Sequence, residues 1–234
     1  GWLLTVQHAA NQRAAQRRFK QDLKQGRTSL DMAKLPLYPY QQEGMMFLAF
    51  TGRALLADEM GLGKTVQAIA GSELLNRLHT IKKVLVISPA SLKSEWLEQI
   101  GKFSDRESLI IQGMRKRRYQ LYQQPAFFYL ANYEQILYDK DYINDEFKPD
   151  LIILDEAQRI KNWQTKTAAA IKQLQSPYAF VLTGTPLENR IDEIYSIAQF
   201  LDPSLFGPLF RFNRDFHELD EKGFAVGYKN LDQL

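Results

Sequence analysis

The stretch DEMGLGKT, residues 58–65, stands between a run of β-forming residues at 53–57 and a helix-forming run at 64–78. Gly61 and Gly63 carry no Cβ atom, so the backbone N–H groups of this loop can turn inward around an anion. N–H groups at the start of a helix attract phosphate, and the positive end of the helix dipole lies behind them. A strand, a glycine-rich loop and a helix in this order predict the phosphate-binding loop of an α/β domain.

Two side chains of this loop suit a nucleoside triphosphate. Lys64 offers a positive charge to the β and γ phosphates, and Thr65 offers a hydroxyl to Mg²⁺. Asp58 replaces the first glycine of the pattern G-x-x-x-x-G-K-[ST], so the loop alone leaves open a glycine-rich turn with a surface lysine. We expect nucleotide binding by Asp58, Glu59, Met60, Gly61, Leu62, Gly63, Lys64 and Thr65.

A second motif, LIILDEAQ at residues 151–158, places two acidic residues directly after an apolar run. The carboxyl edge of a parallel sheet is where ligands bind in open α/β folds. We expect Asp155 to hold Mg²⁺, and Glu156 to orient or deprotonate an attacking water. The alternative is an acidic pair that stabilises a helix N-terminus. The phosphate loop upstream makes that alternative improbable, because two independent motifs would meet at one sheet edge.

From residue 40 onward, short runs of β-forming residues alternate with amphipathic stretches, which is typical of βα units around a parallel sheet. The run 151–154 is apolar without alternation, as in strands covered by helices on both faces. The sequence predicts an α/β fold with a mostly parallel sheet. We expect strands at 53–57, 83–88, 108–112, 127–131, 151–154 and 178–182. We expect helices at 64–78, 91–101, 114–124, 165–175 and 190–200.

The positive charge is concentrated at the N-terminus, where residues 1–35 hold seven Lys/Arg and two Asp/Glu. Residues 5–25 are rich in helix formers and predict a helical arm, with 26–39 as a linker. For this arm and for the cluster at 115–118, a solvated helix face is favoured over a phosphate-binding surface. The candidate phosphate contacts among these basic residues are Arg13, Arg17, Arg18, Lys20, Lys24 and Arg27.

Cysteine is absent, which excludes disulfides and thiolate metal sites and fits a reducing compartment. The apolar runs, such as 84–87, are too short to cross a bilayer. The first residues lack the basic lead and cleavage site of a signal peptide. We therefore expect an intracellular chain without a leader or a membrane partner.

Taken in order, the motifs from about residue 35 to residue 234 resemble those of the Swi/Snf-type chromatin-remodelling ATPases of helicase superfamily 2. Members of that superfamily commonly lack the first glycine of the phosphate loop. The resemblance implies a RecA-like P-loop NTPase lobe at 36–207, preceded by the arm at 1–35 and followed by a phenylalanine-rich extension at 208–234. It implies ATP and Mg²⁺ as cofactors, with Glu156, Lys64 and Asp155 as catalytic residues.

Further residue roles follow from the same resemblance. LPLYPYQQEG, residues 35–44, resembles the adenine-reading segment, in which Gln41 would select ATP. SPASLKSEWLEQI, residues 88–100, resembles a segment that grips the nucleic-acid backbone, with Ser91 capping the following helix. We expect Trp96 to be a core residue rather than a base-stacking platform. ANYEQI, residues 131–136, resembles a further backbone-contacting segment. From its residues alone, an ordinary turn at the end of a strand stays open as an alternative. The expected nucleic-acid contacts are Ser91, Lys93 and Tyr133.

LTGTPLENR, residues 182–190, resembles the motif that links phosphate state to nucleic-acid grip. Its threonines are short hydroxyl donors suited to reaching Asp155 and Glu156. Gln158 stands where His is frequent in the family, and its amide can still hydrogen-bond to neighbouring motifs. We expect altered coupling rather than lost hydrolysis. The coupling residues are Gln158, Thr183, Gly184 and Thr185. Gln158 and the stretch 227–234 favour a prokaryotic member.

The resemblance implies the first lobe of a motor that hydrolyses ATP to move along double-stranded DNA, with RNA the less favoured track. A second RecA-like lobe would supply an arginine, so we expect this chain to belong to a longer protein and to be nearly inactive alone. The implied compartment is the cytoplasm, near the nucleoid, or the nucleus of a eukaryote. Two alternatives stay open: a strand-separating helicase, and a nucleotide-binding scaffold that recruits partners.

Overall fold

The computed structural model describes residues 2–58, 61–160, 165–184, 191–205, 207, 209–219 and 225–228. The strands of its main sheet are β1 (Arg53–Leu56), β2 (Val84–Ser88), β3 (Ser108–Ile110), β4 (Phe128–Asn132), β5 (Leu151–Leu154) and β6 (Tyr178–Leu182). They lie in the order β1-β6-β5-β2-β4-β3, and every neighbouring pair is parallel. The predicted α/β fold with a mostly parallel sheet is confirmed.

The helices are α1 (Trp2–Lys24), α2 (Pro39–Thr51), α3 (Lys64–His79), α4 (Lys93–Phe103), α5 (Arg115–Tyr122), α6 (Tyr133–Tyr142), α7 (Lys166–Lys172), α8 (Ile191–Leu201) and α9 (Leu209–Phe216). Shorter elements are the 3₁₀ turns η1 (Ala90–Leu92) and η3 (Ala157–Ile160), and the π turn η2 (Ile143–Phe147). An antiparallel hairpin of β7 (His217–Leu219) and β8 (Ala225–Tyr228) follows α9.

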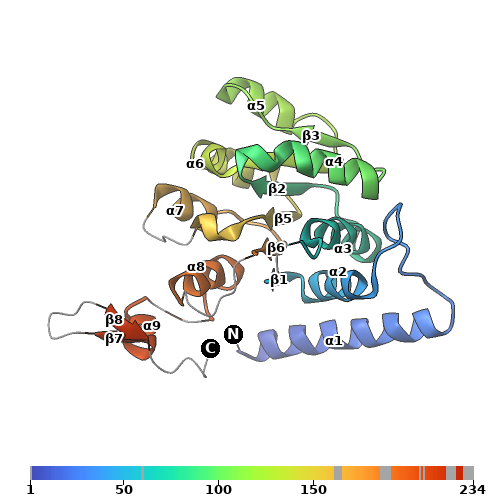
Figure 1. Cartoon of the computed structure of the whole chain (residues 1–234), viewed down its shortest axis with the longest axis horizontal. Coiled ribbons are helices and arrows are strands. Elements are labelled where there is room, and N and C mark those ends of the chain that lie inside the picture. The colour runs from blue at the N-terminus through green and yellow to red at the C-terminus, as the bar shows by residue number, and fades with distance from the viewer. Residues whose placement is uncertain are drawn as a thin grey trace.

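Helices cover both faces of the main sheet (Figure 1). Successive side chains of β2 point to opposite faces, and each face packs against helices. Val84 and Val86 lie in one apolar core together with residues of α2, α3 and α4. Leu85 and Ile87 lie in a second core together with residues of α5, α6, α7 and α8. All five residues of β2 are buried, and the first four, Val84 to Ile87, form a continuous apolar run without alternation.

The N-terminal arm is a helix, as the sequence predicts, and it packs on the body beside α2 (Figure 1). The rings of Phe19 and Phe50 lie 5.4 Å apart, and the Gln12 side chain donates to the carbonyl of Thr51 at 3.0 Å. In the linker, the N–H of Lys34 donates to the carbonyl of Phe103 at 3.0 Å. These contacts join the arm and its linker to α2 and α4.

Three helices, α2, α6 and α9, were not predicted from the sequence. Apolar and polar residues are not well separated around α2, so its sequence shows little helical periodicity. Its start is marked instead by Pro39 at the first helical position and its end by Gly52, with φ of 77°. The start of α6 is fixed by a capping interaction. The N–H of Asn132, the N-cap residue, donates to Gln135 Oε1 at 3.0 Å.

The basic helix α5 is solvated only in part, which corrects the expectation for its cluster. Arg115, Lys116 and Arg117 are exposed, but Arg118 is buried. The guanidinium of Arg118 donates to both carboxylate oxygens of Asp139, each at 2.6 Å. A buried guanidinium needs such a paired carboxylate, and the sequence spacing of 21 residues hides the pair.

Candidate active site

The candidate active site is a cleft of about 420 Å³ at the carboxyl edge of the sheet. The phosphate loop follows β1 and the acidic pair follows β5, so both reach the edge where parallel strands end. The start of α4 forms the third side. The residues that line the cleft are Gly61, Gly63, Lys64, Thr65, Val66, Leu92, Glu95, Trp96, Gln99, Asp155 and Glu156.

The phosphate loop has the left-handed backbone that its glycines allow, with φ of 86° at Gly61 and 68° at Gly63. Helix α3 begins at the next residue, Lys64, whose ammonium donates to the carbonyl of Asp58 at 2.9 Å. The buried Gln67 amide donates to Asp58 Oδ2 at 3.4 Å and to the carbonyl of Leu62 at 3.1 Å. The aspartate that replaces the first glycine is thus bonded from two sides. Glu59 and Met60 lie outside the described residues.

Asp155 is buried, and hydrogen bonds hold it at four of its atoms, one of which is its N–H, a donor to the carbonyl of Ile87 at 2.9 Å. Its Oδ2 accepts from the indole N–H of Trp96 at 2.8 Å, and its Oδ1 accepts from the backbone N–H of Glu156 at 2.9 Å. Its backbone carbonyl accepts from the Tyr133 hydroxyl at 2.7 Å. Burial raises the pKa of the Asp155 carboxyl above its ordinary value and the negative charge of Glu156 adds to the rise, whereas the Trp96 bond and Lys64 lower that pKa.

Glu156 is half-buried and has a φ of 51°, an uncommon conformation for a residue with a side chain. The Gln158 amide donates to the Glu156 carboxylate, and Gln158 Oε1 accepts from the Thr183 hydroxyl at 3.2 Å. The expectation that Gln158 bonds to neighbouring motifs is therefore met. Thr183, which is buried at the end of β6, reaches Glu156 through this amide. Gly184 follows it, and Thr185 lies outside the described residues.

Gln41 lies beside the phosphate loop. Its Oε1 accepts from the N–H of Tyr38 at 3.1 Å, which fixes the amide at the start of α2. A Cβ atom on Gly63 would come within 2.6 Å of Gln41 Nε2, so this glycine also permits the close approach of α2. The structure thus brings Gln41 next to the candidate phosphate site.

The three residues expected to contact nucleic acid differ in exposure: one is exposed and two are buried. Ser91 is exposed in η1, but Leu92 occupies the N-cap position of α4, so the expected cap by Ser91 is wrong. The buried Lys93 ammonium donates to the carbonyl of Ile111 at 2.9 Å and to side-chain oxygens of Asn132 at 3.0 Å and Gln135 at 3.4 Å. Tyr133 is also buried, and its hydroxyl faces Asp155. A direct nucleic-acid contact by any of them stays a prediction.

Trp96 is a core residue, as expected, and it also belongs to the candidate site. It is 1% exposed, in the core shared with α2 and α3, and the one polar atom of its side chain bonds to Asp155. Sequence reasoning placed it in the core but missed this bond. The one signal available is that a buried indole N–H needs an acceptor.

The donor set of the cleft fits Mg²⁺. This ion prefers oxygen ligands and is commonly held by one or two carboxylates together with substrate phosphates. The Thr65 hydroxyl and the Asp155 carboxylate line the same cleft, beside Lys64. Within the described ranges, three or more His, Cys, Asp or Glu side chains nowhere gather as a metal-binding group. The site therefore suits an ion that arrives with a nucleotide.

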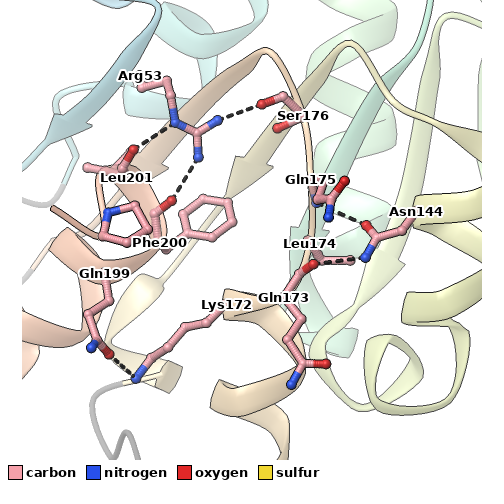
Figure 2. Close-up of a pocket in the computed structure, with 11 residues that line it drawn as sticks. Arg53, Asn144, Lys172, Gln173, Leu174, Gln175, Ser176, Gln199, Phe200 and Leu201 are labelled. Atoms are coloured by element: carbon pink, nitrogen blue, oxygen red, sulfur yellow. Dashed lines mark hydrogen bonds between the residues drawn. The ribbon is translucent and has the colours of Figure 1, made fainter. Parts of the chain in front are cut away.

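A second hollow, of about 630 Å³, lies at the opposite edge of the sheet (Figure 2). Arg53, the first residue of β1, donates there to the carbonyls of Ser176, Phe200 and Leu201, each at 2.7 Å. Burial lowers the pKa of this guanidinium, and Asp202 opposes that change. Because its donors close the end of α8 against β1, Arg53 has a structural role.

A phosphate loop and an acidic pair at one edge of a parallel sheet define a P-loop NTPase lobe. The family model described as SNF2-related domain matches residues 40–234. The chain therefore belongs to the SNF2-related family. None of the described helices is long and apolar enough to cross a membrane.

Curated relatives are similar over most of this chain. It is 33% identical to human TATA-binding protein-associated factor 172 over 83% of the chain and 12% of that protein. It is 34% identical to the ISWI chromatin-remodeling complex ATPase ISW1 of Saccharomyces cerevisiae over 73% of the chain and 16% of that protein. It is 32% identical to human DNA repair and recombination protein RAD54B, over 78% and 22%. The chain thus spans less than a quarter of each of these three relatives.

Solved structures give the same result. The Sulfolobus solfataricus SWI2/SNF2 ATPase core in complex with dsDNA matches with a TM-score of 0.73 and 34% identity. The match covers 81% of this chain and 40% of that one. The Sulfolobus solfataricus SWI2/SNF2 ATPase core domain matches with a TM-score of 0.70 and 34% identity, over 81% of this chain and 39% of that one. The RecA-like fold implied by the sequence motifs is confirmed.

Proposed function

We propose that this chain is the first motor lobe of an ATP-dependent double-stranded DNA translocase. The observation that carries the proposal is the shared cleft of Lys64, Thr65, Asp155 and Glu156. These side chains are the charges and oxygen donors that phosphoryl transfer to water requires. Membership of the SNF2-related family and the likeness to an ATPase core solved with dsDNA support the choice of track.

Each residue of the cleft has a proposed task in hydrolysis. Lys64 leaves the carbonyl of Asp58 and binds the β and γ phosphates, while the loop N–H groups surround them. Thr65 and Asp155 would hold Mg²⁺, and the ion would supply positive charge against the phosphates. Glu156 orients the attacking water and accepts its proton, and the amide of Gln158 fixes the Glu156 carboxylate. Gln41 selects adenine from its place beside Gly63.

A second lobe completes the proposed motor. The chain covers 40% of the solved ATPase core, which leaves room for another lobe in the intact protein. An arginine from that lobe would stabilise the transition state, an effect worth roughly 10³–10⁵ in rate. We therefore propose that this chain, without a second lobe, binds ATP but hydrolyses it slowly. Ser91, exposed before α4, is the proposed backbone contact to DNA.

The test is ATPase activity of the full-length protein, with and without duplex DNA. We expect strong stimulation by duplex DNA and its loss in Glu156→Gln, which keeps the size of the side chain and removes the base. A strand-displacement assay with the same protein separates a translocase from a strand-separating helicase. Nucleotide binding without hydrolysis under all these conditions would indicate a scaffold and overturn the proposal.

A further inference from the structure

Two aromatic donors hold Asp155 from different segments of the chain. Trp96, near the start of α4, bonds to its carboxylate at 2.8 Å, and Tyr133, the first residue of α6, bonds to its carbonyl at 2.7 Å. The segments follow β2 and β4, which with β5 are neighbours in the sheet. We propose that Trp96 and Tyr133 act as positioning residues, a clamp on Asp155 that couples the metal site to the segments after β2 and β4.

The Trp96 bond fixes the carboxylate without using up its acceptor capacity. An indole N–H only donates, and this one is buried, so its partner has to be an acceptor that stays in place. Asp155 Oδ2 accepts from Trp96 and Oδ1 accepts from the N–H of Glu156. Each carboxylate oxygen keeps a second lone pair. The carboxylate is therefore oriented by the protein and still able to bind a metal ion or its water.

The Tyr133 bond fixes the peptide group that leads into Glu156. The accepting carbonyl of Asp155 belongs to the peptide plane from which the unusual φ of 51° at Glu156 is measured. If α6 moves, the hydroxyl pulls on this plane and turns the Glu156 side chain. Both acidic residues thus depend on the clamp, one through its carboxylate and the other through its backbone.

Lys93 makes the two segments move together. Its ammonium, at the start of α4, bonds to the side chains of Asn132 and Gln135 around the start of α6. The third acceptor is the carbonyl of Ile111, just after β3. A displacement of either helix therefore reaches Asp155 through two bonded routes. The network is contiguous: hydrogen bonds join the segments to one another and to Asp155, and the helix backbone joins Lys93 to Trp96 and Gln135 to Tyr133.

The inference rests on the proposed function, because it assigns the coupling in the motor to two residues. If DNA binding shifts α4 and α6, DNA changes the affinity for Mg-nucleotide, and nucleotide must change the affinity for DNA by the same factor. If the clamp carries this coupling, removing either donor lowers the factor by which DNA changes nucleotide affinity. It lowers the factor by which nucleotide changes DNA affinity to the same extent. A purely structural residue would lower stability and leave the two factors unchanged.

The experiment measures this coupling factor in the full-length protein. A fluorescent ATP analogue with Mg²⁺ is titrated with and without duplex DNA, and duplex DNA is titrated with and without the analogue. The variants are Trp96→Phe and Tyr133→Phe, which keep an aromatic ring and remove the donor. We expect the factor to fall about threefold to tenfold in each, the range that one hydrogen bond covers.

Two control variants match the loss of packing or of a hydroxyl elsewhere. Ile100→Ala removes buried volume from the same face of α4 and the same core as Trp96, without any hydrogen bond to lose. Tyr129→Phe removes a hydroxyl that bonds to the carbonyl of Gln124 and the N–H of Ala126, on β4 before Tyr133. Both controls are expected to keep the wild-type factor.

A spectroscopic readout is independent of turnover. The indole N–H resonance of Trp96 is assigned by its loss in Trp96→Phe, and it is expected to shift when duplex DNA alone is added. A factor unchanged in either clamp variant, or an unmoved resonance, overturns the clamp. Wild-type protein that binds neither Mg-nucleotide nor DNA overturns the proposed function instead, so the two failures are distinguishable.

Discussion

The amide of Gln158 lies between Glu156 and Thr183, donating to the carboxylate of the first and accepting from the hydroxyl of the second at 3.2 Å. One side chain thereby joins the end of β5 to the end of β6 at the candidate active site. The uncharged amide can make this bridge at any pH near neutrality, because it does not titrate there.

Removing this bridge should slow hydrolysis more than it weakens binding. In Gln158→Ala the carboxylate of Glu156 loses a fixed donor, so we expect kcat to fall roughly tenfold with little change in KM. Gln158→His, which restores a donor, is expected to recover part of kcat. Steady-state ATPase assays of the full-length protein measure both. A rise in KM at constant kcat would show that Gln158 serves nucleotide binding instead.

The Arg118–Asp139 pair should matter for stability alone. Its two side chains are 9% and 0% exposed, so Arg118→Ala leaves a buried carboxylate without its partner. We expect a loss of about 3–5 kcal/mol in the free energy of unfolding, measured by urea denaturation of the chain. Arg117→Ala, on the exposed face of the same helix, is the control and should stay within about 0.5 kcal/mol. Equal effects of the two substitutions would contradict the assignment.

Gly44 leaves room for the side-chain amide of Gln67. A Cβ atom there would overlap Oε1 of Gln67, whose amide is bonded to Asp58 and to the carbonyl of Leu62. In Gly44→Ala this amide must swing away from the phosphate loop, so we expect a loss of about 1–3 kcal/mol of stability and weaker nucleotide binding.

The matched control for this substitution is Gly101→Ala. Gly101 is exposed in α4 with open space at its Cβ position, and alanine there should stabilise the chain by roughly 0.5–1 kcal/mol. Thermal unfolding and titration with a fluorescent nucleotide check both variants. If Gly44→Ala stabilises as Gly101→Ala does, the account of Gln67 fails.

Lys93 offers a test of its own, because its ammonium faces inward in this structure. Lys93→Ala should lower stability by roughly 1–3 kcal/mol through its three lost bonds, while the salt dependence of DNA binding stays as in the wild type. Each phosphate contact contributes a slope of about 0.9 in the logarithmic salt plot. A slope reduced by about that amount would mean that Lys93 contacts the DNA backbone after all.

Local patterns predicted much of the fold. Residue type and order alone predict a strand at 151–154, and the structure has β5 there. They also predict that the loop at 58–65 follows a strand and opens a helix, and it lies between β1 and α3. Phosphate binding by this loop stays a prediction. Helix α2 was not predicted because its apolar residues show no clear helical periodicity. It packs on α3, and this packing rather than its own sequence pattern defines it.

Contacts between distant segments could not be predicted in the same way. Trp96 and Asp155 are separated by 59 residues, and no local rule says which buried acceptor an indole will find. Lys93 and Arg118 read as surface charges, because a sequence does not show the acceptors that allow a charge to be buried. The candidate site was therefore predicted as a set of residues, whereas the bonds that orient them required the structure.

Arg53 has a consequence for how the lobe bears load. Its guanidinium joins the first residue of β1 to the last carbonyls of α8 (Figure 2). The other end of β1 leads into the phosphate loop. A force applied to the chain after Leu201 is therefore passed to β1 of the main sheet through these hydrogen bonds, before α8 unwinds. In the proposed motor, this joint transmits load from α8 into the main sheet, along the strand that leads to the candidate phosphate loop.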